Sequence, residues 1–121
     1  MNKLQLLKTF QSLGEPNDNK SATAYTVYLD LLECQILVDY FYDADIQSIY
    51  FKQKLNDNKI DFIIPMTVNE NINLLRLHQI RTKLCDDNSA LGMVVAVVCA
   101  NGAIIYHRFS DGKVLDFRLK N

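Results

Sequence analysis

The order of predicted elements indicates an α+β fold, because helix and strand patterns occur in separate blocks along the chain. Two helix patterns open the sequence, three strand patterns follow, and a third helix precedes a pair of apolar strands. The 121 residues are 49% hydrophobic and 22% charged, which is ordinary for one globular domain. We therefore expect a single domain over residues 1–121 in which a sheet packs with helices.

Two helices are expected in the N-terminal third. The first ends at Gly14 and Pro16, and its apolar positions at helical spacing are Leu6, Leu7, Phe10 and Leu13. The second is expected over residues 21–34 and is apolar round most of its circumference. One stripe holds Tyr25, Tyr28, Leu29 and Leu32, and the other holds Ala24, Val27 and Leu31. This pattern predicts a central helix with Leu32 buried.

Three strands are expected next, over residues 36–42, 46–51 and 60–64, with a turn at 56–58. Pro65 is expected to end the third strand. Thr67 and Glu70 then match a capping box, with Thr67 as the N-cap of the third helix. That helix carries an apolar stripe of Leu74, Leu77, Ile80 and Leu84.

The last third holds the clearest strand signal. Residues 93–99 are continuously apolar and predict a strand buried on both faces, with Cys99 buried at its end. Asn101-Gly102 predicts a type I′ hairpin, and residues 104–109 form the return strand. We expect this return strand to lie near an edge of the sheet. The alternative, that residues 114–119 fold back and cover it, stays open.

Composition and motifs exclude several kinds of site. The net charge of −1 argues against a free-standing nucleic-acid binder. The N-terminus has no apolar leader and no run is long enough to cross a bilayer, so we expect a soluble, intracellular protein without a membrane partner. The three cysteines form no CxxC pair, and His78 and His107 match no metal or catalytic spacing. We expect no metal and no cofactor.

Two charge patterns leave alternatives open. Arg76 and Lys83 share a helix face that suits either phosphate contact or plain solvation. Residues 21–51 hold five carboxylates and no Lys or Arg, which disfavours a phosphate backbone. That acidic stretch is either a solvated face or a surface for a basic protein partner.

A resemblance emerges from the order of the motifs. The chain reads Tyr-Thr-Val-Tyr-Leu-Asp-Leu-Leu-Glu over residues 25–33, and a strand ending in proline follows at 61–65. The apolar strand 94–98, the turn 100–102, the strand 104–107 and Ser110-Asp111-Gly112 complete the series. In this order the motifs resemble the small non-catalytic subunit of the eukaryotic tRNA-splicing endonuclease, over nearly the whole chain.

The resemblance implies a mixed sheet packed with helices, like the C-terminal domain of archaeal tRNA-intron endonucleases. It also implies a nuclear role in a four-subunit enzyme with catalytic and structural partners, beside the subunit that cuts precursor tRNA at the 3′ splice site. Precursor tRNA would be met only through the complex, and the isolated chain would form a homodimer. The alternatives are a catalytic tRNA endonuclease subunit and an unrelated dimeric α+β adaptor.

Catalytic relatives cut RNA with a Tyr, a His and a Lys. The resemblance puts that His on the strand before the third helix and that Lys where the apolar strand begins. Residues 59–62 contain no His, and no Lys occurs between Lys83 and Lys113. Since acid–base cleavage needs such groups at the reacting oxygens, the resemblance implies a subunit without catalysis of its own.

The return strand is the predicted partner interface, because it carries large side chains on both faces. Its candidate residues are Asn101, Ile104, Ile105, Tyr106, His107, Arg108 and Phe109. Supporting subunits of this fold commonly dock an acidic hairpin loop in a neighbouring subunit. Residues 100–102 have no carboxylate, so docking would rest either on shape and hydrogen bonds or on another acidic segment, with Asp86, Asp87 and Asp111 as candidates.

Overall fold

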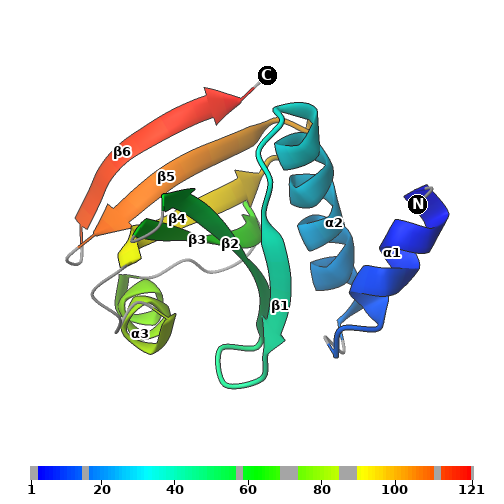
Figure 1. Ribbon diagram of the computed structural model, residues 1–121, viewed down its shortest axis with the longest axis horizontal. Coiled ribbons are helices and arrows are strands. Elements are labelled where there is room, and N and C mark those ends of the chain that lie inside the picture. The colour runs from blue at the N-terminus through cyan, green and yellow to red at the C-terminus, as the bar shows by residue number, and fades with distance from the viewer. Residues whose placement is uncertain are drawn as a thin grey trace.

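The computed structural model describes residues 3–14, 17–56, 59–68, 74–84, 90–110 and 113–120. Within these ranges the chain forms a six-stranded sheet and its covering helices (Figure 1). The elements in chain order are α1 (Lys3–Gln11), α2 (Asp18–Glu33), β1 (Asp39–Asp43), β2 (Ser48–Asn56), β3 (Lys59–Thr67), α3 (Leu74–Leu84), β4 (Ala90–Val98), β5 (Ile104–Ser110) and β6 (Lys113–Lys120). The predicted α+β class is confirmed.

The strands lie in sequence order across the sheet, from β1 to β6. All neighbours are antiparallel except β3 and β4, which run parallel and are connected through α3. A parallel pair needs such a crossover, since a tight turn only reverses the chain. No helix in the described part is long and apolar enough to cross a membrane.

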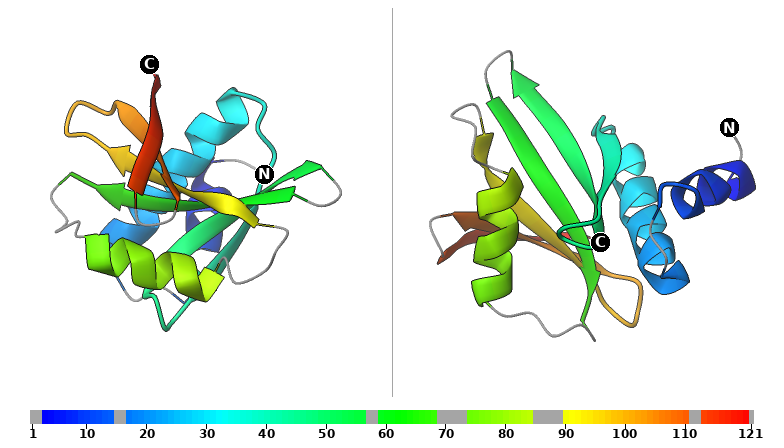
Figure 2. Two further views of the ribbon diagram at one scale, coloured as in Figure 1. Left: turned by 90° about the vertical axis from the view of Figure 1, so that its left-hand side faces the viewer. Right: turned by 90° about the horizontal axis from the view of Figure 1, so that it is seen from below.

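Helices cover both faces of the sheet, as Figure 2 shows with α3 on one side and α2 with α1 on the other. The α2 face holds a buried cluster that includes Phe10, Val27, Leu31 and Phe51. The α3 face holds a second cluster that includes Ile64, Leu77, Ile80 and Met93. The sheet is therefore the middle of three layers, with a hydrophobic core on each side of it.

β4 confirms the prediction of a strand buried on both faces. Its residues from Met93 to Val97 are all buried and alternate between the two clusters. Cys99, just beyond the strand, is only half-buried, so the expectation for it is wrong. It lies at the hairpin turn, where its N–H donates to the carbonyl of Ala103.

α2 begins three residues earlier than predicted, because Asn17 caps it. The Asn17 Oδ1 accepts the backbone N–H groups of Asn19 and Lys20, at 2.9 and 3.2 Å. The buried stripe is Ser21, Ala24, Val27 and Leu31. Leu32 is 39% exposed, so its predicted burial is wrong. The sheet meets the stripe that contains Leu31, and Leu32 points off that stripe.

The C-terminus of α2 is a Schellman motif. The N–H of Ile36 donates to the carbonyl of Leu31, and that of Gln35 donates to the carbonyl of Leu32, both at 2.9 Å. Gln35 therefore has a φ of 61°, in the left-handed region. Ile36 packs on the cluster that contains Leu31, which is the hydrophobic contact typical of this motif.

The first predicted strand is shorter than expected, since Ile36 and Val38 precede β1. Both side chains still pack on the α2-face cluster, which explains their apolar character without strand pairing. In β2, Ile49 and Phe51 lie on the α2 face while Tyr50 packs on the α3 face. Ile46 lies in the turn before β2 and is nevertheless buried against the α3-face cluster.

β3 runs through Pro65 to Thr67, so the predicted end at Pro65 is wrong. The register of β3 with β2 reaches only Ile63, and beyond it β3 pairs with β4 alone. A proline is tolerated where one side of the strand has no ladder. Thr67 lies in this strand rather than at the N-cap of α3, so the predicted capping box is wrong; Glu70 lies outside the described residues.

The hairpin between β4 and β5 exists, but its turn type differs from the prediction. The N–H of Gly102 donates to the carbonyl of Cys99 at 2.9 Å, and that of Cys99 to the carbonyl of Ala103 at 2.8 Å. Gly102 has a φ of +89°, whereas Asn101 does not have the positive φ that a type I′ turn requires. The loop is thus the three-residue form that ends in a left-handed glycine.

β6 covers the outer edge of β5, so the expected exposed edge is wrong. The two strands are antiparallel, with Ile105 opposite Leu119 and His107 opposite Phe117. The alternative in which residues 114–119 fold back is the one observed. β5 is an internal strand with backbone pairing on both sides.

Candidate functional site

The predicted interface follows β5 and the loop before it, and the structure divides its residues among three surroundings. Asn101 lies in the hairpin loop, where its Oδ1 accepts the N–H of Ala103 at 3.0 Å. Ile104, Tyr106 and Arg108 pair with β4 residues on the α2 face, and Ile105 and His107 pair with residues on the α3 face. The Phe109 side chain lies outside the described part of the chain.

Tyr106 connects the sheet to α2. Its hydroxyl donates a hydrogen bond of 2.6 Å to the Asp30 carboxylate, and its ring packs on the α2-face cluster. Ile104 is 3% exposed in the same cluster. These two predicted interface residues therefore hold the helix on the sheet, which is a structural role.

Arg108 forms a two-pronged ion pair with Asp61 on β3. Its two terminal nitrogens donate to the two carboxylate oxygens, at 2.9 and 2.7 Å. Asp61 is 2% exposed, whereas the Arg108 side chain is 25% exposed. A bidentate pair of this kind satisfies a buried carboxylate and fixes the guanidinium in one orientation.

Gly92 explains how this ion pair reaches from β3 to β5 over the intervening strand β4. Gly92 is in register with Asp61, and Val94, two residues later, is in register with Arg108. Strand alternation puts Gly92 and Val94 on the same face, so a residue without a side chain lies beneath the pair. Asp61 on β3 and Arg108 on β5 thus meet across the intervening strand.

One feature of the sequence points to Asp61, although Asp61 is not among the predicted site residues. The residue interrupts the apolar run Ile60-Asp61-Phe62-Ile63-Ile64, and an ionised side chain is almost never fully buried without a partner. Its partner, Arg108, lies 47 residues away along the chain. The sequence pattern therefore indicated that Asp61 needs a cationic partner. Which residue is that partner depends on the strand register, and the register depends on the fold.

The α3 face beneath β5 carries Ile105 and His107, both half-buried. Their partners on β4, Val97 and Val95, are buried in the α3-face cluster. These two residues are the described part of the predicted interface that lies away from α2. The acidic docking candidates Asp86, Asp87 and Asp111 all lie outside the described residues.

Lys83, a candidate phosphate contact, is an ion-pair partner instead. Its amine lies 2.6 Å from the Asp45 carboxylate, between the end of α3 and the turn before β2. This hydrogen bond lowers the pKa of Asp45 below its usual value. The side chains of Arg76 and His78 lie outside the described part.

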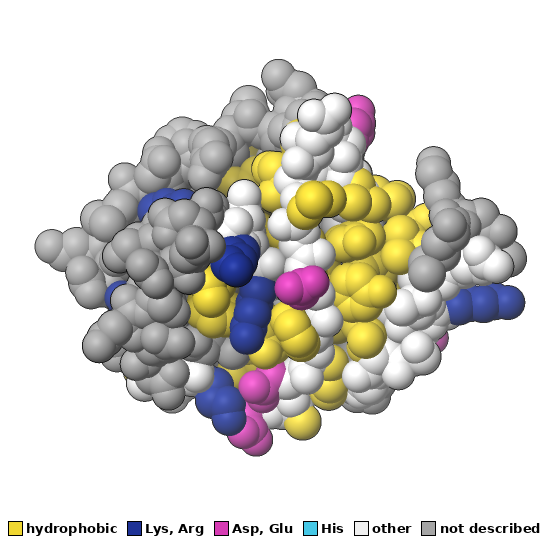
Figure 3. Space-filling model, in the orientation of Figure 1, with side chains coloured by type: hydrophobic (Ala, Val, Ile, Leu, Met, Phe, Trp, Pro, Cys, Tyr) yellow, Lys and Arg dark blue, Asp and Glu magenta, His cyan; other side chains and the backbone are white. Residues whose placement is uncertain are grey.

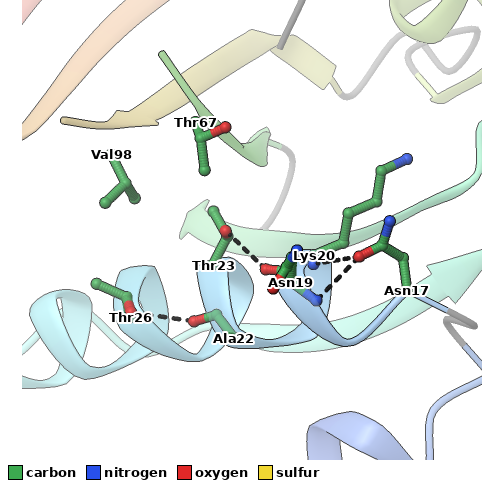
Figure 4. Close-up of a pocket in the computed structure, with 8 residues that line it drawn as sticks. All are labelled: Asn17, Asn19, Lys20, Ala22, Thr23, Thr26, Thr67 and Val98. Carbon is green, nitrogen blue, oxygen red and sulfur yellow. Dashed lines mark hydrogen bonds between the residues drawn. The ribbon is translucent and has the colours of Figure 1, made fainter. Parts of the chain in front are cut away.

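A hollow of about 530 Å³ lies beside the N-terminal half of α2 (Figure 4). Several polar groups of its lining are engaged in the protein's own hydrogen bonds. The hydroxyls of Thr23 and Thr26 donate to the helix carbonyls of Asn19 and Ala22, at 2.8 and 3.0 Å. The Lys20 amine donates to the carbonyl of Gln47 at 3.0 Å. The hollow therefore offers no cluster of groups aimed at a ligand.

No group of three or more metal-ligating side chains occurs in the part of the chain that the structure describes.

The sequence model of one protein family, described as Sen15 protein, matches residues 26–115. That match spans α2 through to β6. No curated protein matches the chain.

Proposed function

The chain belongs to the Sen15 family, the small subunit of the tRNA-splicing endonuclease, and from this premise we propose that it is a structural subunit without catalysis of its own. As a subunit of that complex it takes part in tRNA processing and splicing. In the proposal it supports the catalytic subunit that cuts precursor tRNA at the 3′ splice site. The family match argues against an unrelated adaptor.

The Asp61–Arg108 ion pair is the observation that best supports the proposal that this subunit does not cut RNA. In catalytic relatives the strand before α3 supplies a His, and the start of the apolar strand supplies a Lys. Here β3 carries Asp61, and β4 carries Gly92 in register with it. The Asp61 carboxylate accepts two hydrogen bonds from Arg108, at 2.9 and 2.7 Å. Both oxygens of this carboxylate are engaged by Arg108, and the glycine has no side chain to stabilise a developing charge.

A cleavage assay tests the proposal directly. The purified chain, incubated with intron-containing precursor tRNA, is expected to leave the RNA intact. The catalytic subunits prepared with this chain are expected to cut at both splice sites, and preparations lacking it are expected to lose cleavage at the 3′ site. Cleavage by the purified chain that disappears in the His107→Ala variant would establish the catalytic alternative.

The proposed complex has four subunits, and its location is the nucleus. The isolated chain is proposed to form a homodimer, and precursor tRNA is proposed to meet this subunit only within the complex. Mass measurement of the complex and of the isolated chain tests both stoichiometries. A fluorescent fusion in cells tests the location, and a cytoplasmic signal would contradict it.

A further inference from the structure

β1 is an open edge of the sheet within the described part of the chain. It pairs with β2 on one side, and the strand order places no described strand on the other. In Figure 3 the corresponding surface, over β1 and α2, shows gathered hydrophobic side chains with acidic ones among them. Phe41 within the strand is 37% exposed, and Leu37 just before it is 80% exposed. An edge of this kind is a template for another strand.

The side chains along β1 alternate in a regular pattern. Tyr40 turns to the α2 face, where its ring lies 4.9 Å from that of Phe10. Asp39, Phe41 and Asp43 share the opposite face, since side chains alternate along a strand. That face carries a carboxylate, an aromatic ring and a carboxylate in a row. The Oδ1 of Asp43 accepts the N–H groups of Asp45 and Ile46, at 2.8 and 3.3 Å, and its Oδ2 lies outside these two hydrogen bonds.

The charge of this edge restricts its occupant. β1 itself carries two carboxylates, Asp39 and Asp43, and no Lys or Arg, whereas Asp45 beyond it is paired with Lys83. Such a surface repels a phosphate backbone, so RNA is a poor occupant. A second copy is also disfavoured, because antiparallel pairing centred on Phe41 sets Asp39 opposite Asp43. Like charges directly opposite one another destabilise a strand pair.

Lys52 lies beside this edge, on the neighbouring strand β2. It is in register with Asp39, but its amine lies over aromatic rings, 5.0 Å from the centroid of Phe41 and 5.7 Å from that of Phe62. Phe41 also stacks on Tyr50, with centroids 5.4 Å apart. Phe41 is thereby fixed on its inner side, while 37% of the residue remains exposed to an incoming strand.

We propose that the β1 edge docks an extended, basic segment of a protein partner as an added strand. The segment carries the pattern basic–x–apolar–x–basic, which sets cations opposite Asp39 and Asp43 and an apolar side chain opposite Phe41. Backbone pairing supplies affinity, and the alternating side chains supply the choice of partner. This surface is separate from β5, and the proposal does not depend on the role in tRNA splicing.

A short peptide is the probe. A fluorescein-labelled nine-residue peptide with Lys-Thr-Val-Thr-Lys at its centre is titrated with the full chain, and binding is followed by fluorescence anisotropy. The control peptide has Glu in place of both Lys. We expect the Lys peptide to bind at least tenfold more tightly than the Glu peptide, with β1 amides gaining protection from hydrogen exchange.

Two further controls separate strand pairing from simple charge attraction. A Lys peptide N-methylated at alternate residues keeps its charge but loses the donors of one edge, and we expect at least a tenfold loss of binding. The Asp39→Lys variant should weaken the Lys peptide by a similar factor. Asp18→Lys makes the same charge change at an exposed residue of α2 and should leave binding within about twofold.

Each remaining outcome overturns the proposal. Equal binding of the Lys and N-methylated peptides would mean attraction without strand addition. Equal binding of the Lys and Glu peptides would show that charge does not select the occupant. The absence of binding at 1 mM peptide would show that the β1 edge does not dock such a segment. If the chain alone forms dimers that protect β1 amides, a second copy is the occupant. Protection of β1 amides by an RNA oligonucleotide would identify RNA instead.

Discussion

A single buried residue, Asp61, shows how a charge in an apolar strand depends on one distant partner. Its carboxylate is 2% exposed and is held by both terminal nitrogens of Arg108. Removing only one member of such a pair leaves the other charge buried without compensation. Replacing both by apolar residues avoids that penalty. The single replacement and the double replacement are therefore expected to differ in their free energy of unfolding.

The Arg108→Met variant is expected to lose about 3 kcal/mol of unfolding free energy, because Asp61 then stays buried without its cation. The Asp61→Leu/Arg108→Met double variant is expected to recover most of that loss. Guanidinium denaturation of both variants and the Asp61→Leu single variant completes a double-mutant cycle. Additive losses would contradict a direct ionic coupling between the two side chains.

At the scale of elements, α2 shows where sequence periodicity was informative and where it was not. Its two apolar stripes were readable, and the residues of the stripe containing Ala24, Val27 and Leu31 are all buried. Which stripe faces the sheet depended on the three-dimensional arrangement, and Leu32 lies on the other one. The start was missed because Asn17, the cap, stands among several polar residues with equal propensity.

Two neighbouring leucines of α2 are therefore expected to differ sharply. Leu31→Ala should lower the free energy of unfolding by about 2–5 kcal/mol, since it opens a cavity in the α2-face cluster. Leu32→Ala should cost less than about 1 kcal/mol, because Leu32 is 39% exposed. Thermal unfolding of both variants measures the difference. Equal losses would contradict the observed orientation of the helix.

The end of α2 supplies a second prediction at this scale. Gln35 has a φ of 61° at the position that follows the helix cap, where glycine is the usual residue. Gln35→Gly should raise the unfolding free energy by up to about 1 kcal/mol, because it relieves the left-handed backbone of a residue with a Cβ. Gln11→Gly, in the last turn of α1, is the control and should destabilise. A less stable Gln35→Gly protein would contradict this account.

At the scale of the whole molecule, the sequence predicted which segments form strands better than it predicted which strands are neighbours in the sheet. β4 was predictable because its residues are apolar on both faces, which only an internal strand requires. The position of β6 was not, since its alternating pattern fits an open edge or a cover over β5 equally well. The candidate interface on β5 therefore stays a prediction, and the backbone edge that it was expected to offer is occupied by β6.

This correction changes how β5 should be tested as an interface. With β6 paired to it, β5 offers a partner its side chains rather than its backbone. Tyr106→Asp is not a suitable variant, because it would bring a second carboxylate against Asp30, 2.6 Å from the Tyr106 hydroxyl, and so destabilise the monomer itself. The α3 face of the strand, with Ile105 and His107, remains the part to probe.

Ile105→Asp is expected to weaken assembly with the proposed catalytic partner by at least tenfold, because it puts a charge on the half-buried α3 face of β5. Leu75→Asp, at a 68% exposed residue of α3, makes the same kind of change away from that strand and should assemble normally. Size-exclusion chromatography and pull-down measure assembly, and circular dichroism checks that both monomers are folded. If a folded Ile105→Asp protein assembles as well as the unmodified chain, partner contact through this face of β5 is excluded, since a buried carboxylate without a partner would cost several kcal/mol in the complex.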